Sequence, residues 1–236
     1  MTAIIHRADS RGLADRGWLI SRHTFSFSDY HNPQRMNFGL LRVINDDIVK
    51  PGKGFGTHPH DNMEIISIPL SGSLRHEDSM GNRHVVSAGE VQVMSAGSGL
   101  THSEYNNSDH EDVNFLQIWI QPKEKNIPPR YGQMRFDRAG RQNRFQTLVA
   151  PEESPKTILI NQDAWLSMAD LTAGTHIEYQ KHGQGSGVYF IIVTGKVGIA
   201  GNILDRRDGL ALIEGGSIPI EAQSDAEVLA IEIPLN

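Results

Sequence analysis

The sequence of 236 residues contains no cysteine. This absence excludes a disulfide framework, a thiolate nucleophile and a cysteine-ligated zinc finger. The sequence also lacks an apolar run long enough to span a membrane, and residues 1–9 lack the apolar core of a signal peptide. We therefore expect a soluble protein of the cytoplasm, with no membrane partner.

The sequence also has fewer basic than acidic residues. It contains 22 Lys and Arg residues and 28 Asp and Glu residues, which gives a net charge of −6. The basic residues are scattered and form no block. An electrostatic grip on nucleic acid needs such a block, so we expect no direct contact with nucleic acid. The apolar content of 38% is ordinary for a soluble globular protein.

The sequence also lacks long segments with the apolar periodicity of an amphipathic helix, whereas short apolar runs are frequent. Residues 23–28 alternate strictly, with Phe25 and Phe27 on one face. Further runs are typical of strands, at residues 40–44, 63–70, 90–94 and 115–120.

Turn residues separate these runs. Asn45-Asp46-Asp47 is expected to be a turn, and residues 78–82 the loop of a hairpin. Many short strands with Gly, Pro, Asn and Asp between them indicate an all-β, antiparallel sandwich or barrel.

Two pairs of possible metal ligands stand out, His58-Pro59-His60 and His102-Ser103-Glu104. Side chains at i and i+2 of a strand point to the same face, so two facing strands can bring four ligands onto one ion. Three imidazoles and a carboxylate suit a divalent transition metal better than calcium or magnesium. An octahedral ion with four protein ligands keeps two open positions, which indicates a metal that acts on a substrate.

Spacing alone does not identify the carboxylate. Glu64 shares a face with His58 and His60 if one strand runs unbroken through all three, so it competes with Glu104 for the position. The remaining histidines of the first half are expected to be surface or hydrogen-bonding groups: His6, His31, His76, His84 and His110.

The strand pattern repeats in the second half, because residues 188–197 echo residues 64–74 and residues 208–213 echo residues 88–94. When the copies are aligned on their glycines, the places of the four ligands are taken by Lys181, Gly183, Ala222 and Ser224. We therefore expect no metal in the second copy, and no ligand role for His176 or His182.

Several segments together resemble the pirin family of two-domain cupins. They read HTFSF (23–27), LRVINDD (41–47), GFGTHPH (54–60), HEDSMGN (76–82) and SAGSG (95–99), and the resemblance is densest over residues 12–136. It implies two cupin-type barrels (double-stranded β-helices, or jelly rolls) packed together. We place the metal-binding domain at residues 1–136 and a degenerate, metal-free domain at residues 137–236.

The resemblance also implies which residues hold the metal: His58, His60, His102 and Glu104. Ordinary cupins use the carboxylate at the place of Glu64, which here is expected to orient an imidazole from behind. We expect Fe(II) as the metal, although the same donor set accepts Zn, Ni, Co, Mn or Cu.

Bacterial pirins resemble flavonol 2,3-dioxygenases (quercetinases), which open the heterocycle with O2 and release carbon monoxide. The resemblance thus implies a flavonol-like substrate, with Glu104 as the general base that takes the proton of the 3-hydroxyl.

Other pirins resemble metal- and redox-sensing partners of transcription factors or metabolic enzymes. A regulator with a protein partner is therefore the alternative. A roomy apolar cavity that opens on the metal would favour the enzyme, and a closed metal beneath a charged rim would favour the sensor. We expect a monomer.

Overall fold

The computed structural model describes residues 2–236, and their fold is all-β, as the sequence predicted. Residue 1, which we assigned to the first domain, lies outside the described part. Two short 3-10 helices occur among the described residues, η1 (Ala8–Ser10) and η2 (Arg138–Arg141). The N-terminal half forms the strands β1 (Ala3–His6), β2 (Gly12–Asp15), β3 (Leu19–His23), β4 (Leu41–Val49), β5 (Gly54–His60), β6 (Glu64–Ser71), β7 (Ser73–Asp78), β8 (Arg83–Ser87), β9 (Glu90–Ser95), β10 (Leu100–Asn106), β11 (Val113–Ile120) and β12 (Arg130–Arg135).

The C-terminal half forms a second set of strands: β13 (Gln146–Ala150), β14 (Ile158–Leu159), β15 (Trp165–Leu171), β16 (His176–Gln180), β17 (Ser186–Thr194), β18 (Lys196–Ile199), β19 (Asn202–Asp205), β20 (Gly209–Leu212), β21 (Ser217–Ala222) and β22 (Ala226–Pro234).

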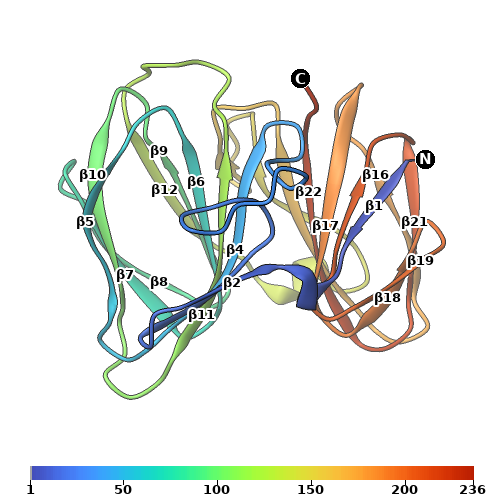
Figure 1. Ribbon diagram of the computed structural model, residues 1–236. Coiled ribbons are helices and arrows are strands. Elements are labelled where there is room, and N and C mark those ends of the chain that lie inside the picture. Colours follow the sequence, from blue (N-terminus) through green and yellow to red (C-terminus); the bar gives the residue numbers. More distant parts are fainter. Residues whose placement is uncertain (1) are drawn as a thin grey trace.

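The first barrel consists of two sheets that face each other. A seven-stranded sheet has the order β12-β9-β6-β11-β4-β3-β2, and a four-stranded sheet has the order β5-β10-β7-β8. In Figure 1 this barrel lies on the left, and the second barrel stands beside it on the right. The predicted hairpin around residues 78–82 is confirmed as β7 and β8.

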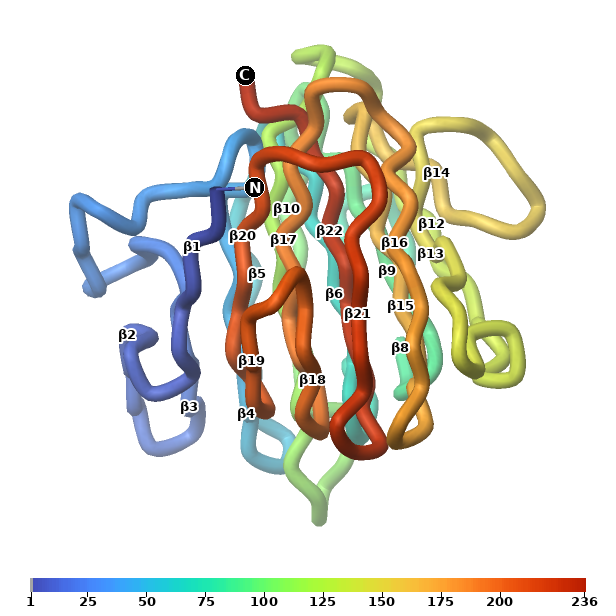
Figure 2. Tube along the Cα trace, turned by 90° about the vertical axis from the view of Figure 1, so that its right-hand side faces the viewer, coloured from blue at the N-terminus to red at the C-terminus, as the bar shows by residue number. Residues whose placement is uncertain are grey.

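The second barrel repeats this plan, with sheets ordered β1-β20-β17-β22-β15-β13-β14 and β16-β21-β18-β19. Its edge strand β1 comes from the N-terminus, because Ile5 pairs with Leu210 of β20. Figure 2, in which the second barrel faces the viewer, shows β1 beside β20. The domain boundary after residue 136 stays a prediction, and β1 departs from it by crossing to the second barrel.

Alternate residues of strand β11 face the second barrel and the interior of the first barrel. Ile118 and Ile120 are fully buried in the apolar core between the barrels. Phe115, Gln117 and Trp119 alternate with them and therefore point into the first barrel. Each strand of the large sheet thus contributes both to the contact between the barrels and to the interior of its own barrel.

The largest apolar core lies between the two seven-stranded sheets. Ile44 and Ile118 of the first barrel belong to it together with Leu229 and Ile231 of the second. Burying one such side chain contributes about 1.5–3 kcal/mol. This shared core therefore holds the barrels together as one unit.

The interiors of the two barrels differ in polarity. The second interior is a large apolar cluster that includes Phe190, Val197 and Ile218. The first contains two smaller apolar clusters, one around Phe115 and one around Met94. Buried polar side chains fill much of the remaining space, so the first barrel is the half that can hold a polar site.

Two local predictions were wrong. Asn45-Asp46-Asp47 is not a turn but the middle of β4, and all three residues are buried. Their side chains have partners there, since Asn45 bonds His23 and Asp46 bonds Arg207, and such partners outweigh the weak strand propensity of Asn and Asp. The alternating run at residues 23–28 also fails as a strand, because β3 ends at His23.

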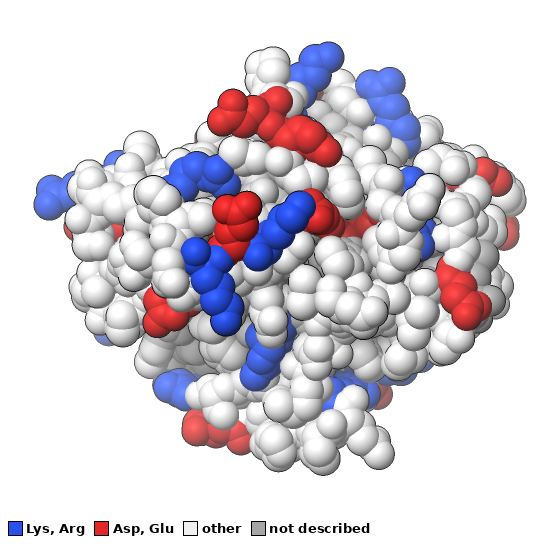
Figure 3. All heavy atoms as spheres, turned by 90° about the horizontal axis from the view of Figure 1, so that it is seen from above, with Lys and Arg blue, Asp and Glu red and all other residues white. Residues whose placement is uncertain are grey.

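On the face seen in Figure 3, basic and acidic side chains are interspersed and form no large area of one sign. Residues 2–236 form no helix that is long and apolar enough to cross a membrane.

A buried guanidinium links the two barrels. Arg207 Nε lies 2.9 Å from Asp46 Oδ2 on β4, and Arg207 Nη2 donates to Asn114 Oδ1 at 2.7 Å. Nη1 donates to the carbonyl of Val193 at 2.7 Å. Removal of this side chain would leave Asp46 buried with Arg11 as its remaining basic neighbour, at 3.6 Å.

We predict that Arg207→Ala lowers the free energy of unfolding by about 3 kcal/mol, because it breaks the closer of the two ion pairs of the buried Asp46. Chemical denaturation measures the change. Arg206→Ala is the matched control, since Arg206 is exposed and its loss should change the stability by no more than about 0.5 kcal/mol. Equal effects in the two variants would contradict the prediction.

Candidate metal centre

Neighbouring strands β5 and β10 carry the two predicted ligand pairs. The strands are antiparallel, and His58 lies directly opposite His102. A bulge shifts the register between His102 and Glu104. Both of these side chains are nevertheless buried, with 1% and 2% exposure, and both point into the barrel.

The three imidazoles of His58, His60 and His102 meet at one place. The Nε2 atoms of His58 and His102 are 3.1 Å apart, and the ring centroids of the three pairs are 4.5 to 4.9 Å apart. One ring nitrogen from each residue lies within 4.8 Å of the others. Donor atoms gathered this closely can surround one metal ion.

The protonation states of the three histidines are those that bind a metal. His58 Nδ1 lies 2.7 Å from the carbonyl of Gly56, which can only accept, so Nδ1 carries the proton and Nε2 keeps a lone pair. Burial and the neighbouring histidines lower the pKa of His60 to about 4 and that of His102 to about 3. Neutral imidazole is the form that binds a metal. The buried Nε2 of His60 has no hydrogen-bond partner in the described chain, so it is free for a ligand.

Glu104 is held from the large sheet. Its Oε1 accepts a hydrogen bond from the Ser67 hydroxyl at 3.0 Å, and its Oε2 accepts one from Gln117 Nε2 at 2.9 Å. A carboxylate has about four lone-pair positions, so each oxygen keeps one for another partner. Glu104 and His102 form a second group of close ligand atoms with His76, again within 4.8 Å.

His76 is the member of this cluster that sequence reasoning missed. It is fully buried, and its Nε2 lies 3.1 Å from Asp78 Oδ2. The expectation of a hydrogen-bonding group is therefore met, but not at the surface. The alternation of Leu74 and His76 along β7 was the available signal, because both residues point inward.

Glu64 is not brought to the cluster, which corrects the expectation that it orients an imidazole. β5 ends at His60, Asn62 has a positive φ of 46°, and β6 begins at Glu64, so the strand is broken between the pair and the carboxylate. Glu64 instead points away from the cluster, and it accepts hydrogen bonds from the Ser95 hydroxyl of β9 at 2.7 Å and from the Asn161 amide of the second half at 3.1 Å.

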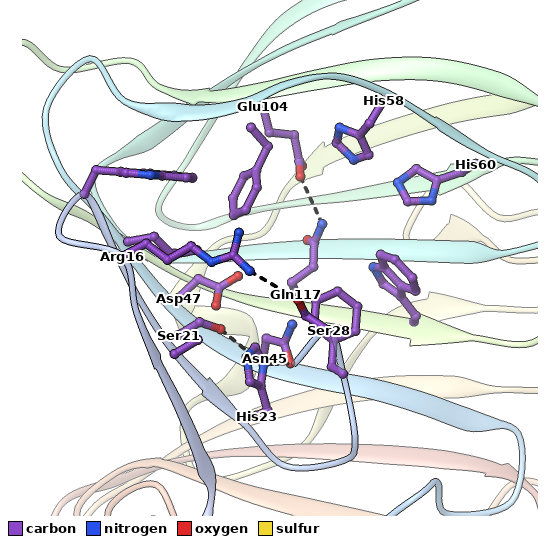
Figure 4. Close-up of a pocket in the computed structure, with 16 residues that line it drawn as sticks. Arg16, Ser21, His23, Ser28, Asn45, Asp47, His58, His60, Glu104 and Gln117 are labelled. Carbon is purple, nitrogen blue, oxygen red and sulfur yellow. Dashed lines mark hydrogen bonds between the residues drawn. The ribbon is translucent and has the colours of Figure 1, made fainter. Parts of the chain in front are cut away.

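A cavity of about 280 Å³ opens beside the cluster, near the lower limit of about 300 Å³ that is usual for small-molecule sites. In the view of Figure 4, His58, His60 and Glu104 lie above Gln117, and a polar group lies below it. That group consists of Ser21, His23, Asn45 and Asp47. The apolar part of the wall consists of Trp18, Leu19, Phe27, Phe55 and Trp119.

Asp47 is the most perturbed acid of this wall. Burial raises its pKa to about 7, although a hydrogen bond from Ser21 opposes the shift. Its carboxyl group therefore changes protonation near neutral pH, unlike that of an exposed aspartate.

The register of the strands shows what replaces the cluster in the second barrel. Gly72 packs on Val113, and Gly195 packs in the same way on Ala226, so these two glycines are equivalent. Counted from them along β7–β10 and β18–β21, the equivalents of the N-terminal cluster include neither a histidine nor a carboxylate. Ile218 replaces His102, Ile220 replaces Glu104, Ile199 replaces His76, Tyr179 replaces His58 and Lys181 replaces His60.

This register corrects the sequence alignment, which had placed Lys181 and Gly183 at the positions of His58 and His60, and Ala222 and Ser224 at those of His102 and Glu104. The stretch from Leu210 to Ile218 is two residues shorter than the equivalent stretch from Gln92 to His102, and the connection from β16 to β17 is two residues longer than that from β5 to β6, so the alignment on glycines slipped. The expectation that the second barrel binds no metal is strengthened, because isoleucine offers no metal ligand.

The two histidines of the second barrel have other partners. His176 is exposed and lies 3.7 Å from Glu221. His182 stacks on Trp165, with ring centroids 5.1 Å apart, and bonds Glu232. Burial alone would raise the pKa of Glu232, but hydrogen bonds from His182, Ser186 and the backbone outweigh it and lower the pKa to about 2.

Comparisons with known proteins agree with this architecture. The family model described as Pirin matches residues 6–120, and the one described as Quercetinase C-terminal cupin domain matches residues 147–233. The chain is 43% identical to a quercetin 2,3-dioxygenase of Escherichia coli K12 over 98% of both proteins. It is 40% identical to a pirin-like protein of Caulobacter vibrioides over 95% of this chain and 96% of that one.

A solved structure has the same fold. The bacterial pirin YhhW of Escherichia coli, in complex with nickel(II), aligns with a TM-score of 0.93 and 42% identity over 99% of both chains. The two barrels described above are therefore cupin-type domains, as the sequence led us to expect.

We predict that His102→Ala lowers the affinity for a divalent metal by orders of magnitude, because it removes the ligand that both close groups share. Elemental analysis after reconstitution and dialysis measures the bound metal. His176→Ala is the control and should keep the wild-type content. A content near one ion per chain in His102→Ala would contradict the assignment.

Proposed function

The chain belongs to the pirin family, and we propose that it is a metal-dependent flavonol 2,3-dioxygenase. In this reaction O2 opens the heterocycle of quercetin-like flavonols, and carbon monoxide is released. The observation that carries the proposal is the cavity, whose wall includes His58, His60 and Glu104. A cavity that opens on the ligand cluster favours catalysis over the alternative of a metal-sensing regulator.

We infer one divalent transition metal at His58, His60, His102 and Glu104. Fe(II) is our proposal for its identity, and Zn, Ni, Co, Mn and Cu are compatible with three imidazoles and one carboxylate. When bound, such an ion supplies a Lewis acid with open positions, which makes a coordinating hydroxyl group more acidic.

Glu104 is proposed as the general base. Ser67 and Gln117 each donate to one of its oxygens, so the carboxylate is fixed in place before a substrate binds. The lone pairs that remain can accept the proton of the 3-hydroxyl at Oε1 or Oε2.

The apolar wall is proposed to orient the flat substrate and to exclude water. Phe27 packs edge-on against Trp119 with centroids 5.2 Å apart, and Trp18 packs edge-on against Phe55 at 5.3 Å. Trp119 in turn contacts the ring of His60 at 5.0 Å. Aromatic groups therefore surround the approach to the cluster and match the shape and polarity of a flavonol.

We predict that the protein, reconstituted with Fe(II) without oxygen and then exposed to O2, releases carbon monoxide and the ring-opened ester from quercetin. Glu104→Gln should lower kcat by about 10²–10⁴-fold, the range for loss of a general base. Carbon monoxide is measured by gas chromatography, and metal content is measured alongside to separate loss of the base from loss of the ion.

Glu64→Gln is the matched control, because it neutralises a buried carboxylate that lies on the large sheet, away from the ligand cluster. Its turnover should stay within about threefold of wild type, since ordinary effects outside a site are small. The proposal fails if the metal-loaded protein forms neither carbon monoxide nor the ring-opened product from any hydroxylated flavonol.

A further inference from the structure

A row of polar side chains crosses the floor of the first barrel. Ser67, Gln117, Asn45 and His23 lie directly opposite one another on the adjacent strands β6, β11, β4 and β3. The row begins at Glu104, to which Ser67 and Gln117 donate. It therefore connects the metal centre to the polar group at the other end of the cavity.

Two unused hydrogen-bond acceptors lie near the far end of this row, one on His23 in the row and one on Asp47, which is two residues beyond Asn45 on β4 and opposite Ser21. His23 Nδ1 lies 2.8 Å from Asn45 Oδ1, so Nδ1 carries the proton and Nε2 keeps its lone pair. This Nε2 is buried and has no partner in the described part of the chain. The same is true of Asp47 Oδ1. Both residues are 3% exposed, and both line the cavity.

The second barrel shows that the fold does not need polar groups at the positions of Asp47 and Gln117, although Ser167 and Thr147 keep a polar, hydrogen-bonded pair at the positions of Asn45 and His23. Counted from Gly72 and Gly195, the residue equivalent to Asp47 is Ala169, and the one equivalent to Gln117 is Ala230. Both alanines are fully buried in an apolar cluster. Unpartnered buried acceptors destabilise a protein, so their presence in the cavity of the first barrel alone points to a ligand that satisfies them.

We propose that Asp47 and His23 form a subsite that accepts hydrogen bonds from the two adjacent hydroxyl groups of the substrate's phenyl ring. This inference rests on the proposed function, and it narrows the substrate class to flavonols with a catechol ring. Two acceptors need two donors. The fused ring of quercetin offers fewer, since its 5-hydroxyl is already bonded to its own 4-carbonyl, whereas both catechol hydroxyls are free.

The test compares quercetin with galangin, which differ only in the two phenyl-ring hydroxyls. Dissociation constants are measured by anaerobic calorimetry on the metal-loaded protein. Asp47→Leu removes both carboxylate oxygens and keeps the branching at Cγ, and it should raise the constant for quercetin about 10- to 100-fold, while that for galangin changes less than about threefold. Asp47→Asn keeps one oxygen and should give an intermediate loss.

His23→Phe provides a second, independent variant and should show the same selective loss. Glu64→Gln is the control and should leave both constants unchanged. Equal losses for the two flavonols in well-folded Asp47→Leu and His23→Phe would overturn the subsite, and so would wild-type binding that does not distinguish quercetin from galangin.

Turnover separates this inference from the function on which it rests. If wild type releases carbon monoxide from both flavonols but the variants lose affinity for both flavonols equally, the function stands and the subsite is overturned. If quercetin binding shows the selective loss but no carbon monoxide is formed, the subsite is supported and the dioxygenase proposal is overturned.

Discussion

The alternation of side chains across the large sheet of the first barrel is the constraint on which the rest of the structure depends. Successive residues of a strand point to opposite faces, so each of β4, β6 and β11 must supply two different environments. Ile118 faces the second barrel, and its neighbour Gln117 faces Glu104. A shift of one residue in any of these strands would put the isoleucines in the cavity and the polar row in the apolar core.

This constraint explains why the interior of the first barrel is polar and that of the second is apolar. Buried polar groups destabilise a fold unless they have partners, and the first barrel contains many of them. The second barrel has replaced such positions by apolar residues such as Phe190 and Ala230, and its interior is a continuous cluster. Together with the core between the barrels, that cluster supplies the apolar burial that the first interior lacks.

The sequence was sufficient for the parts of the site that obey simple periodicity. His58 and His60, like His102 and Glu104, are two residues apart on one strand, and the structure brings the three imidazoles together. Periodicity failed where the chain leaves regular geometry. The break at Asn62 sends Glu64 to the other face, and no propensity rule foresees that Asp47 lies in the middle of a strand.

The remaining part of the site could not be predicted because it depends on pairings between distant segments. His76 joins the cluster because β7 lies beside β10, where it stands opposite Glu104. His23 and Asn45 meet because β3 pairs with β4 in one particular register. Each of these polar residues looks like a surface or turn residue when it is considered alone. Their placement follows from the pairing of the strands, which puts His76 beside Glu104 in one sheet and His23 and Asn45 in the polar row of the other.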